Sequence, residues 1–262
     1  MLPRFWDCST SSDNIIALSL CDGGVAFFDT RTGNKIGSRI SIPTYHDCLM
    51  AFSPDGKWIV IQGGHRQKCT LDLWNVDTRT RVKKIEIESE HLLYHITYSA
   101  DGEKVMFVTW RALSKSRDRT VLIWDVKTDK PLKRLEVEAL DVAISPDGSQ
   151  IAIHDELGIK IIDVGTEHID RQITLSEDLR TFYDSNSRIA WSPNGQFLAS
   201  ATTKQSRTKL YLLTRGSAQV PIITRLECST TKYVCQLAFS PDSSKVVAVL
   251  GDNATRRMTL SI

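Results

Sequence analysis

The sequence predicts an all-β fold built from repeated units, and three observations lead to this prediction. One turn motif recurs along the chain, a second motif recurs between its copies, and no stretch of a dozen residues combines sustained helical periodicity with caps. Of the 262 residues, 41% are hydrophobic and 24% are charged, as in ordinary globular domains. This composition excludes a disordered chain, a collagen and a coiled coil.

The first motif reads apolar-Ser-Pro-Asp-Gly and predicts a strand end followed by a tight turn. Proline presets the first dihedral angle of the turn, aspartate bonds to its own backbone, and glycine accepts a positive φ. The copies are Phe52–Gly56, Tyr98–Gly102, Ile144–Gly148, Trp191–Gly195 and Phe239–Ser243, with a weaker first copy at Ser9–Asn14. The serines at 53, 99, 145, 192 and 240 are separated by steps of 46, 46, 47 and 48 residues.

The second motif marks the end of a later strand and the turn that follows it. An apolar residue precedes Asp or Asn, and a threonine follows three positions after the acid or amide. The clear copies are Phe28-Asp29, Trp74-Asn75, Trp124-Asp125 and Ile162-Asp163, and degraded ones are Leu212-Leu213 and Leu260-Ser261. Six units in 262 residues average about 44 each, which is the period of one four-stranded propeller blade.

Each unit is expected to contain four short strands. Apolar first strands precede the turns at 48–52, 96–98, 142–144, 189–191 and 237–239, and second strands follow them at 58–61, 105–109, 150–154, 197–201 and 246–250. Third strands end at the second motif, as in Thr120–Trp124, and outer strands follow, as in Arg81–Ile87 and Leu132–Val137. The predicted units of a single domain are 5–40, 45–87, 92–136, 139–174, 187–226 and 233–262.

The segments Asp118–Asp125 and Phe52–Gly56 resemble the two signatures of the WD-repeat family of β-propellers. The resemblance covers nearly the whole chain and implies about six four-stranded blades. The Gly-His pair of the family is absent from its usual position, since Gly64-His65 follows a second strand instead. The resemblance also implies a buried hydrogen-bonded tetrad, which the third unit alone matches, with His91, Thr109, Asp118 and Trp124. Its role would be structural, because it would satisfy buried polar groups.

The last unit stops on its third strand at Ile262. In closed propellers of this family the N-terminal segment usually completes the final blade, but Met1–Arg4 is too short to form a strand before Phe5. We therefore expect an incomplete last blade, with an exposed strand edge or an unclosed ring, unless another chain or further sequence caps it. The sequence would then be a fragment of a longer protein.

Motifs that carry catalysis are missing from the sequence. There is no Gly-x-Ser-x-Gly, Gly-x-x-x-x-Gly-Lys or Gly-x-Gly-x-x-Gly pattern. His91 and His95 share a strand face, but no third metal ligand accompanies them. His154-Asp155-Glu156 is interpreted as a solvated turn, and the six cysteines as buried reduced thiols. The sequence therefore predicts no catalytic residue, no metal and no cofactor.

Charge is balanced in number, with 33 basic and 31 acidic residues, but it is unevenly placed. In a propeller, the loops joining second to third strands emerge on one face. Those loops carry Arg66, Lys68, Arg111, Lys115, Arg117, Arg119, Lys204, Arg207, Lys209, Arg256 and Arg257. The opposite face mixes signs, for example Arg79 with Asp77 and Lys127 with Asp129. We expect the basic face to meet an acidic protein segment, with anionic lipid or nucleic acid as alternatives. The competing interpretation is that these loops are polar because they are solvated.

Two long connections are candidate contact surfaces, namely Trp110–Arg119 and Ser176–Ser187 with Phe182 and Tyr183. The aromatic pair could equally begin a first strand.

The predicted function is a non-enzymatic scaffold or adaptor that presents the loop-lined basic face to partner proteins. One alternative is an anion-binding module, and another is a propeller enzyme or small-ligand binder in the central channel. The apolar first strands count against the last. Because no export signal or membrane-length apolar stretch is found, we expect a cytoplasmic or nuclear protein.

Overall fold

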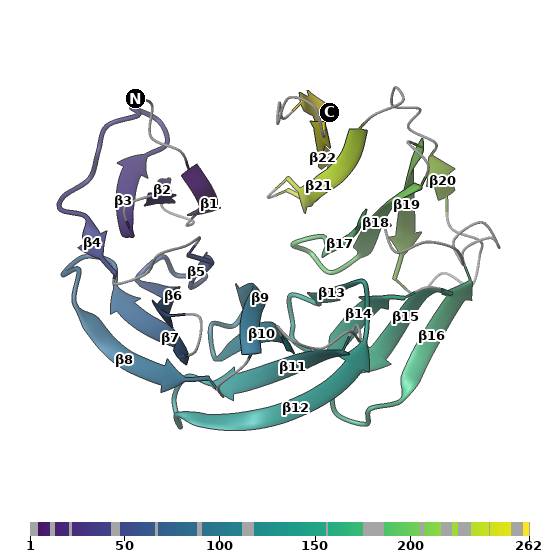
Figure 1. Cartoon of the computed structure of the whole chain (residues 1–262), viewed down its shortest axis with the longest axis horizontal. Helices are drawn as coiled ribbons and strands as arrows, with labels where there is room; N and C mark the ends of the chain where they lie inside the picture. Colours follow the sequence, from purple (N-terminus) through teal and green to yellow (C-terminus); the bar gives the residue numbers. More distant parts are fainter. Residues whose placement is uncertain are drawn as a thin grey trace. The chain divides into compact units, whose positions relative to one another are not determined.

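The computed structural model describes residues 5–10, 14–20, 23–42, 48–65, 68–87, 91–111, 118–155, 157–174, 186–204, 207–215, 222–224, 232–240, 242–252 and 259–261. These residues form strands and turns but no helix, which confirms the all-β prediction (Figure 1). They divide into two compact units, Met1–Val137 (unit 1) and Glu138–Ile262 (unit 2). Within the described ranges, no helix has the length and hydropathy that a membrane crossing requires.

Unit 1 contains three antiparallel sheets in its described part, each with its four strands in chain order. The first consists of β1 (Phe5–Thr10), β2 (Ile15–Leu20), β3 (Gly24–Asp29) and β4 (Ile40–Ser41). The second consists of β5 (Met50–Phe52), β6 (Trp58–His65), β7 (Lys68–Asn75) and β8 (Arg81–Glu86). The third consists of β9 (His91–Tyr98), β10 (Lys104–Arg111), β11 (Asp118–Asp125) and β12 (Lys130–Glu138).

Unit 2 has the same meander topology in its described residues. Its first sheet consists of β13 (Asp141–Ile144), β14 (Gln150–His154), β15 (Gly158–Asp163) and β16 (Ile169–Thr174). The second consists of β17 (Asn186–Trp191), β18 (Phe197–Lys204), β19 (Arg207–Thr214) and β20 (Ile222–Thr224). The third is described as three strands, β21 (Lys232–Phe239), β22 (Val246–Asp252) and β23 (Thr259–Ser261).

Each sheet coincides with one predicted repeat, and the main difference lies in the length of the second strands. Pairing of β6 with β7 continues to His65 and Lys68, and pairing of β10 with β11 continues at least to Trp110 and Arg119. The predicted loop from Trp110 to Arg119 therefore begins and ends in strand residues. Its remainder, and the predicted surface at Phe182 and Tyr183, lie outside the described residues.

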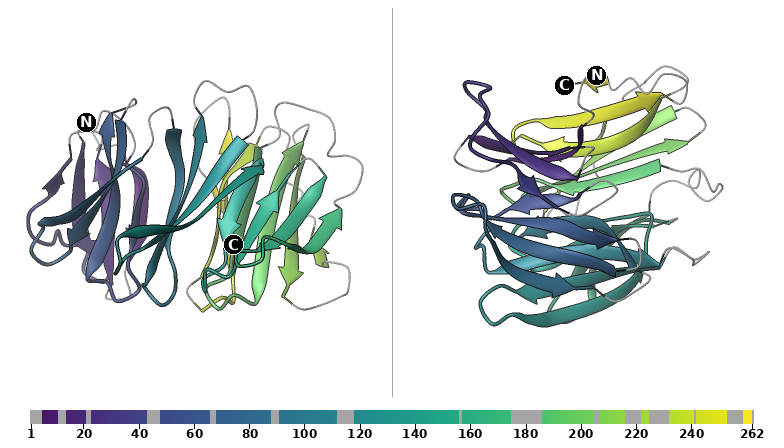
Figure 2. Two further views of the ribbon diagram at one scale, coloured as in Figure 1. Left: turned by 90° about the horizontal axis from the view of Figure 1, so that it is seen from below. Right: turned by 60° about the vertical axis from the view of Figure 1, so that its left-hand side comes forward.

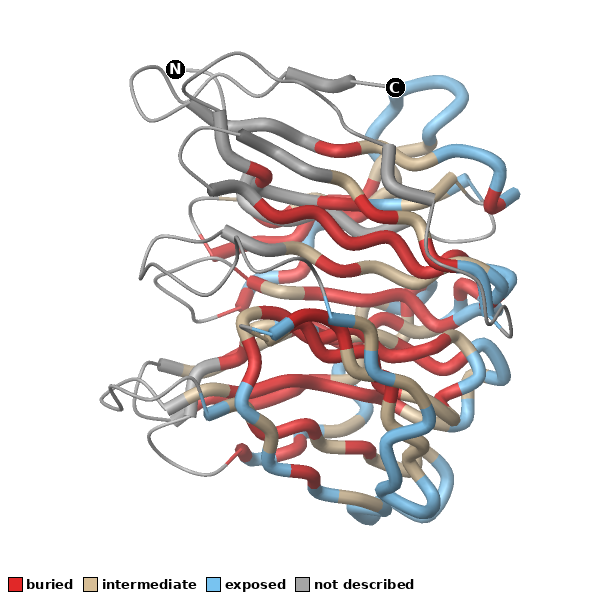
Figure 3. The backbone as a smooth tube through the Cα atoms, turned by 90° about the vertical axis from the view of Figure 1, so that its right-hand side faces the viewer, coloured by how far each residue is buried: buried red, intermediate tan, exposed pale blue. Residues whose placement is uncertain are grey.

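The core lies between neighbouring sheets of the same unit. In unit 1, β5 contacts both β1 and β9, and in unit 2, β17 contacts both β13 and β21 (Figure 1). Figure 2 shows the same sheets in two further views. Between the first two sheets, Phe27 and Phe52 meet edge to face with ring centroids 6.3 Å apart. Figure 3 shows buried residues along the strands and exposed ones at the turns. Cys48 and Cys69 are buried thiols outside any disulfide, as predicted; the other cysteine side chains lie outside the described part.

The first turn of each repeat is closed by the serine of its motif. Between β9 and β10, Ser99 Oγ donates to Asp101 Oδ1 (2.5 Å) and accepts the backbone N–H of Lys104 (3.0 Å). Asp101 Oδ1 also accepts the N–H of Glu103 (2.9 Å). The same serine bonds recur at Ser53, Ser145, Ser192 and Ser240. The predicted turn is confirmed, and the serine is its central acceptor.

The turn after the third strand is capped by the acid or amide of the second motif. Its side-chain oxygen accepts the N–H of the threonine three residues on, at 2.8 Å for Thr32, 2.8 Å for Thr78, 2.6 Å for Thr128 and 2.7 Å for Thr166. The next residue takes a positive φ, which is 71° at Gly33, 57° at Arg79, 59° at Asp129 and 63° at Glu167. Three of these turns thus hold a side chain where glycine is favoured.

Turns of neighbouring sheets lie against one another. A Cβ added at Gly102 would lie 3.5 Å from Pro54 Cδ, and one at Gly195 would lie 3.8 Å from Pro146 Cδ. The backbone N–H of Asn194 donates to Ser243 Oγ in the next sheet (3.1 Å). The turns after the first strands and those after the third strands therefore lie at one end of the sheets of a unit, which we call the turn side. The opposite end, where second strands connect to third strands, is the hairpin side.

Candidate functional site

The predicted basic residues lie at the hairpin side wherever their backbone is described. They lie within the last position or the first three positions of the second and third strands, because the strands run further than expected. These residues are Lys68, Arg111 and Arg119 in unit 1, and Lys204, Arg207 and Lys209 in unit 2. The predicted Arg66, Lys115, Arg117, Arg256 and Arg257 lie outside the described residues.

Arg119 is the predicted basic residue whose side chain is described, and it is stacked on aromatic rings. Its Cζ lies 4.4 Å from the centroid of the Tyr94 ring and 5.8 Å from that of the Trp110 ring. Trp110 is its direct cross-strand partner, and all three side chains are half-buried. The Nε of Arg119 is enclosed and has no hydrogen-bond partner within the described part of the chain. A cation held against two rings is fixed in place but keeps its charge.

A β-bulge in the first strand places Tyr94 beside this arginine. Val108 pairs with His95, but the next residue, Thr109, pairs with Leu93, so Tyr94 is the extra residue of β9. A bulge interrupts the alternation of side chains and redirects one of them. The sequence contains no signal for this bulge, and for that reason Tyr94 was not among the predicted site residues.

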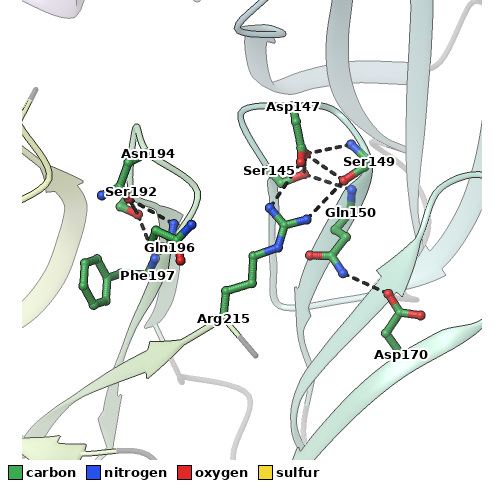
Figure 4. Close-up of polar contacts among 10 residues, drawn as sticks. All are labelled: Ser145, Asp147, Ser149, Gln150, Asp170, Ser192, Asn194, Gln196, Phe197 and Arg215. Atoms are coloured by element: carbon green, nitrogen blue, oxygen red, sulfur yellow. Dashed lines mark hydrogen bonds and ion pairs between the residues drawn. The ribbon is translucent and has the colours of Figure 1, made fainter. Parts of the chain in front are cut away.

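Several charges on the turn side are paired with each other. In unit 2, Arg215 Nη1 lies 3.2 Å from Asp147 Oδ2 of the neighbouring sheet, and Nη2 lies 3.5 Å from Ser149 Oγ (Figure 4). Burial opposes ionisation of Asp147, but the hydrogen bonds from Ser145, Ser149 and Arg215 outweigh it, so the pKa of Asp147 lies below its usual range. Arg215 thereby joins two sheets without leaving an unpaired charge.

Unit 1 shows the same pairing at its turn side. Lys83 Nζ lies 3.0 Å from Asp129 Oδ1 in the next sheet, and Trp124 Nε1 donates to the same carboxylate oxygen (3.1 Å). Lys127 pairs with Glu103. The hydrogen bond to Glu103 raises the pKa of Lys127. The expectation of mixed charge at this end is met by ion pairs.

The predicted tetrad does not form between Trp124 and Thr109. Trp124 donates to Asp129, and Thr109, although fully buried, has no partner for its hydroxyl among the described residues. Asp118 is exposed at the first position of β11. The side chain of His91 lies outside the described part. Asp129, the positive-φ residue of the turn, accepts the hydrogen bond from Trp124 Nε1, so Thr109 does not accept it.

A buried polar network is found instead in the sheet β5–β8. Asp72, 3% exposed, accepts from Arg81 Nη1 (2.9 Å) and from Thr70 Oγ1 (3.2 Å). The space beside it is kept by Gly63, because a Cβ there would lie 2.8 Å from Thr70 Oγ1. This network joins adjacent strands of one sheet and has the geometry of a structural element.

His154 was interpreted as part of a solvated turn, and this is wrong because it is only 1% exposed. Its Nδ1 lies 3.1 Å from Ser200 Oγ of the neighbouring sheet. Burial lowers the pKa of His154 to about 4, so the ring is neutral at pH 7. Nearby, Asp141 Oδ2 accepts the backbone N–H of Ile189 (2.8 Å). These buried groups connect two sheets of unit 2. Asp155 accepts two backbone N–H groups and pairs with Lys160.

Among the described residues, no group of three or more His, Cys, Asp or Glu could hold a metal ion. His95 is exposed on β9, and the side chain of His91 lies outside the described part. The first strands are mostly apolar and buried, as expected, with Asp141 as a buried exception. Arg119, stacked at the hairpin side, is therefore the predicted site residue whose guanidinium can still bind a ligand.

Comparisons with known proteins identify the fold. No family model matches the sequence, and no curated protein matches it. Among solved structures, the chain is similar to hydrazine synthase of Kuenenia stuttgartiensis, with a TM-score of 0.69, 16% identity, and coverage of 99% of this chain and 76% of that one. It is also similar to the Dos1 propeller, with a TM-score of 0.66, 14% identity, and coverage of 95% and 66%. At these identities the likeness bears on the fold alone, and the chain has a β-propeller fold.

Proposed function

We propose that the chain is a non-enzymatic WD-repeat scaffold that binds partner proteins through the hairpin side of unit 1. The observation that carries this proposal is the charge of Arg119 at the hairpin side. By comparison, Lys83, Lys127 and Arg215 on the turn side are paired with acids. At the hairpin side, Arg119 is stacked and has no acidic partner among the described residues.

The fold supports a binding role. A propeller blade fixes its strand ends, and connections between fixed strands can vary in sequence without loss of the core. Long pairing of β10 with β11 supports the ends of the connection between them. The buried first strands, such as β5 and β13, leave little polar surface from which a catalytic centre could be assembled. We expect the protein to act in the cytoplasm or nucleus as an adaptor.

The test is recovery of partner proteins from native cells by affinity purification and mass spectrometry. The test variant reverses three hairpin-side charges of unit 1, Arg111→Glu, Lys115→Glu and Arg117→Glu. The control reverses three exposed turn-side charges of the same unit, Arg31→Glu, Lys35→Glu and Lys57→Glu. We expect the first variant to lose the partners that the wild type and the control retain. Equal recovery by all three proteins would contradict the proposal.

A further inference from the structure

We propose that Arg119, held between Tyr94 and Trp110, is the anchoring site for a carboxylate side chain in an acidic segment of a partner protein. This inference rests on the proposed function, because it names the chemistry recognised at the same hairpin side. It depends on three features of the described residues, which are the stack, the missing counter-ion and the bulge that forms the stack.

The stack fixes the guanidinium before any ligand arrives. Cζ is 4.4 Å from the Tyr94 centroid and 5.8 Å from the Trp110 centroid, so the side chain is restrained by contacts on its sheet. A long side chain normally loses rotamer freedom when it binds, and a restrained one loses less. The planar fork of arginine also matches a carboxylate with two parallel hydrogen bonds.

The charge of Arg119 is left without a counter-ion in the described part of the chain. Its Nε is enclosed without an acceptor, and burial of an unpaired donor is unfavourable. Since Nε is enclosed, the terminal nitrogens are the atoms that can bind a ligand. Asp118, the preceding residue, belongs to the opposite face of β11, because side chains alternate along a strand.

Other arginines differ from Arg119 in this respect. Arg81 pairs with Asp72, Arg215 with Asp147, and Arg171 donates to the carbonyl oxygen of Thr214. These arginines join strands or neighbouring sheets. Arg119 lies near a strand end, where it stacks on rings of β9 and β10 but pairs with no acid among the described residues. Its sequence neighbours Arg111, Lys115 and Arg117 would attract an acid to it.

The surroundings favour a protein segment over a nucleic acid or a membrane. Binding to a polyanionic backbone depends on many phosphate contacts spread over a basic surface. The chain as a whole has a net charge of only +2. A single fixed guanidinium between two half-buried rings suits one acidic side chain whose neighbours pack on Tyr94 and Trp110.

The experiment measures binding of fluorescein-labelled octaglutamate by fluorescence anisotropy at low salt, with octaglutamine as the matched neutral probe. We expect the wild type to bind octaglutamate only, and Arg119→Gln to weaken binding about tenfold, since a charge-assisted bond is lost. Arg119→Lys and Tyr94→Leu each should weaken it several-fold, because the fork or the stack is lost. Arg31→Gln on the turn side is the control and should bind like the wild type.

A spectroscopic signature separates ligand binding from a change in folding. The arginine Nε–H resonance that disappears in Arg119→Lys identifies Arg119, and octaglutamate should shift it in the wild type while octaglutamine does not. Arg119→Lys keeps the charge and the stem, so it remains folded even if Arg119→Gln does not.

Wild-type binding to octaglutamate that Arg119→Gln leaves unchanged, or no binding at all, would overturn the inference. If partner recovery still depends on Arg111, Lys115 and Arg117 in that case, the proposed function stands and only the anchor is wrong. Tighter, Arg119-dependent binding of an oligothymidylate or of phosphatidylserine vesicles would also overturn the assignment to a protein segment.

Discussion

The turn side and the hairpin side are built by the same strands, but the charged side chains described on them have different partners. On the turn side, Asp147 and Arg215 neutralise each other across two sheets, and so do Lys83 and Asp129. At the hairpin side, Arg119 is held by aromatic rings and has no acid to meet it among the described residues. Exposed ion pairs contribute little stability, so the main effect of these two pairs is to neutralise their own charges. The ring-stacked guanidinium of Arg119 keeps its charge and is suited to bind a partner.

This contrast between the two sides concerns charged groups, because neutral hydrogen-bond donors without a partner are found on both sides among the described residues. Trp74 Nε1 is buried without a partner in the described residues, whereas Trp124 in the next sheet donates to Asp129. The position equivalent to Asp129 is Arg79, which cannot accept a hydrogen bond and instead lies over the Phe27 ring, 3.7 Å from its centroid. One substitution within a repeat therefore decides whether its tryptophan is satisfied.

The largest effect is expected at the hairpin side of unit 2, where His154 is buried. Its pKa of about 4 lies below the ordinary 6.5, so the unfolded chain binds the proton first as pH falls. Stability should be constant above pH 6.5 and fall by about 3 kcal/mol between pH 6.5 and 4. Denaturant unfolding at a series of pH values measures this.

The variant His154→Gln should remove that pH dependence, and His168→Gln, at an exposed position of the same sheet, should retain it. Asp242 affects stability in a different pH range from His154. Hydrogen bonds from Ser240 and Ser244 lower the pKa of Asp242 to about 2, so its contribution to stability is lost at lower pH. Stability that rises on acidification from pH 6.5 would show that the imidazolium is stabilised, contrary to the burial argument.

The next effect compares two buried hydroxyls of one sheet, beginning with Ser99 at the turn side. Ser99→Ala removes the acceptor for Lys104 N–H and the donor to Asp101. We expect a loss of about 2 kcal/mol, because these groups are left unpaired in a closed turn. Thermal and denaturant unfolding measure it, and Ser53→Ala in the preceding sheet should give a similar loss. A loss below about 0.5 kcal/mol would mean that the serine bonds contribute little net energy.

Thr109 at the hairpin side should respond in the opposite direction. Its hydroxyl is fully buried without a partner in the described residues, so Thr109→Val removes an unsatisfied group at nearly constant volume. We expect a gain of about 1 kcal/mol in unfolding free energy. A clear loss of stability would indicate that the hydroxyl is bonded, as the predicted tetrad required.

The smallest effect tests strain at the turn side. Glu167 has a φ of 63°, whereas the equivalent residue of the first sheet is Gly33. Glu167→Gly should stabilise the protein by about 0.5 kcal/mol, because relief of the left-handed strain exceeds the entropy that glycine adds to the unfolded chain. Glu167→Ala keeps the strain and is the control. A gain that alanine matches would locate the effect in the side-chain contacts of Glu167 instead.

Much of the fold could be predicted because the turn chemistry is local. Ser, Pro, Asp and Gly at fixed spacing act within five residues, and the turn at Ser145–Gly148 forms as the motif indicates. The range of β14, Gln150–His154, was predicted correctly. Strand ends at the hairpin side could not be predicted, since pairing such as that of His65 with Lys68 depends on both strands at once.

The site was only partly predictable, for a different physical reason. A strand packed between two sheets is buried on both faces, so the alternation of β14 gives no sign that His154 is buried. The bulge at Tyr94 is likewise set by the pairing of β9 with β10. Arg119 was identified by its position in the repeat, but the rings that hold it became visible only in three dimensions.

The contact of each turn with the preceding one has a consequence for how such repeats can change. A Cβ at Gly102 would be in van der Waals contact with Pro54, and one at Gly195 with Pro146, so the turns pack closely enough to constrain the spacing of successive sheets. A residue inserted there would shift the neighbouring repeat as well as its own. Changes in loop length, whether by evolution or by design, are therefore expected at the hairpin side, where a longer loop can be added without changing the spacing of the sheets.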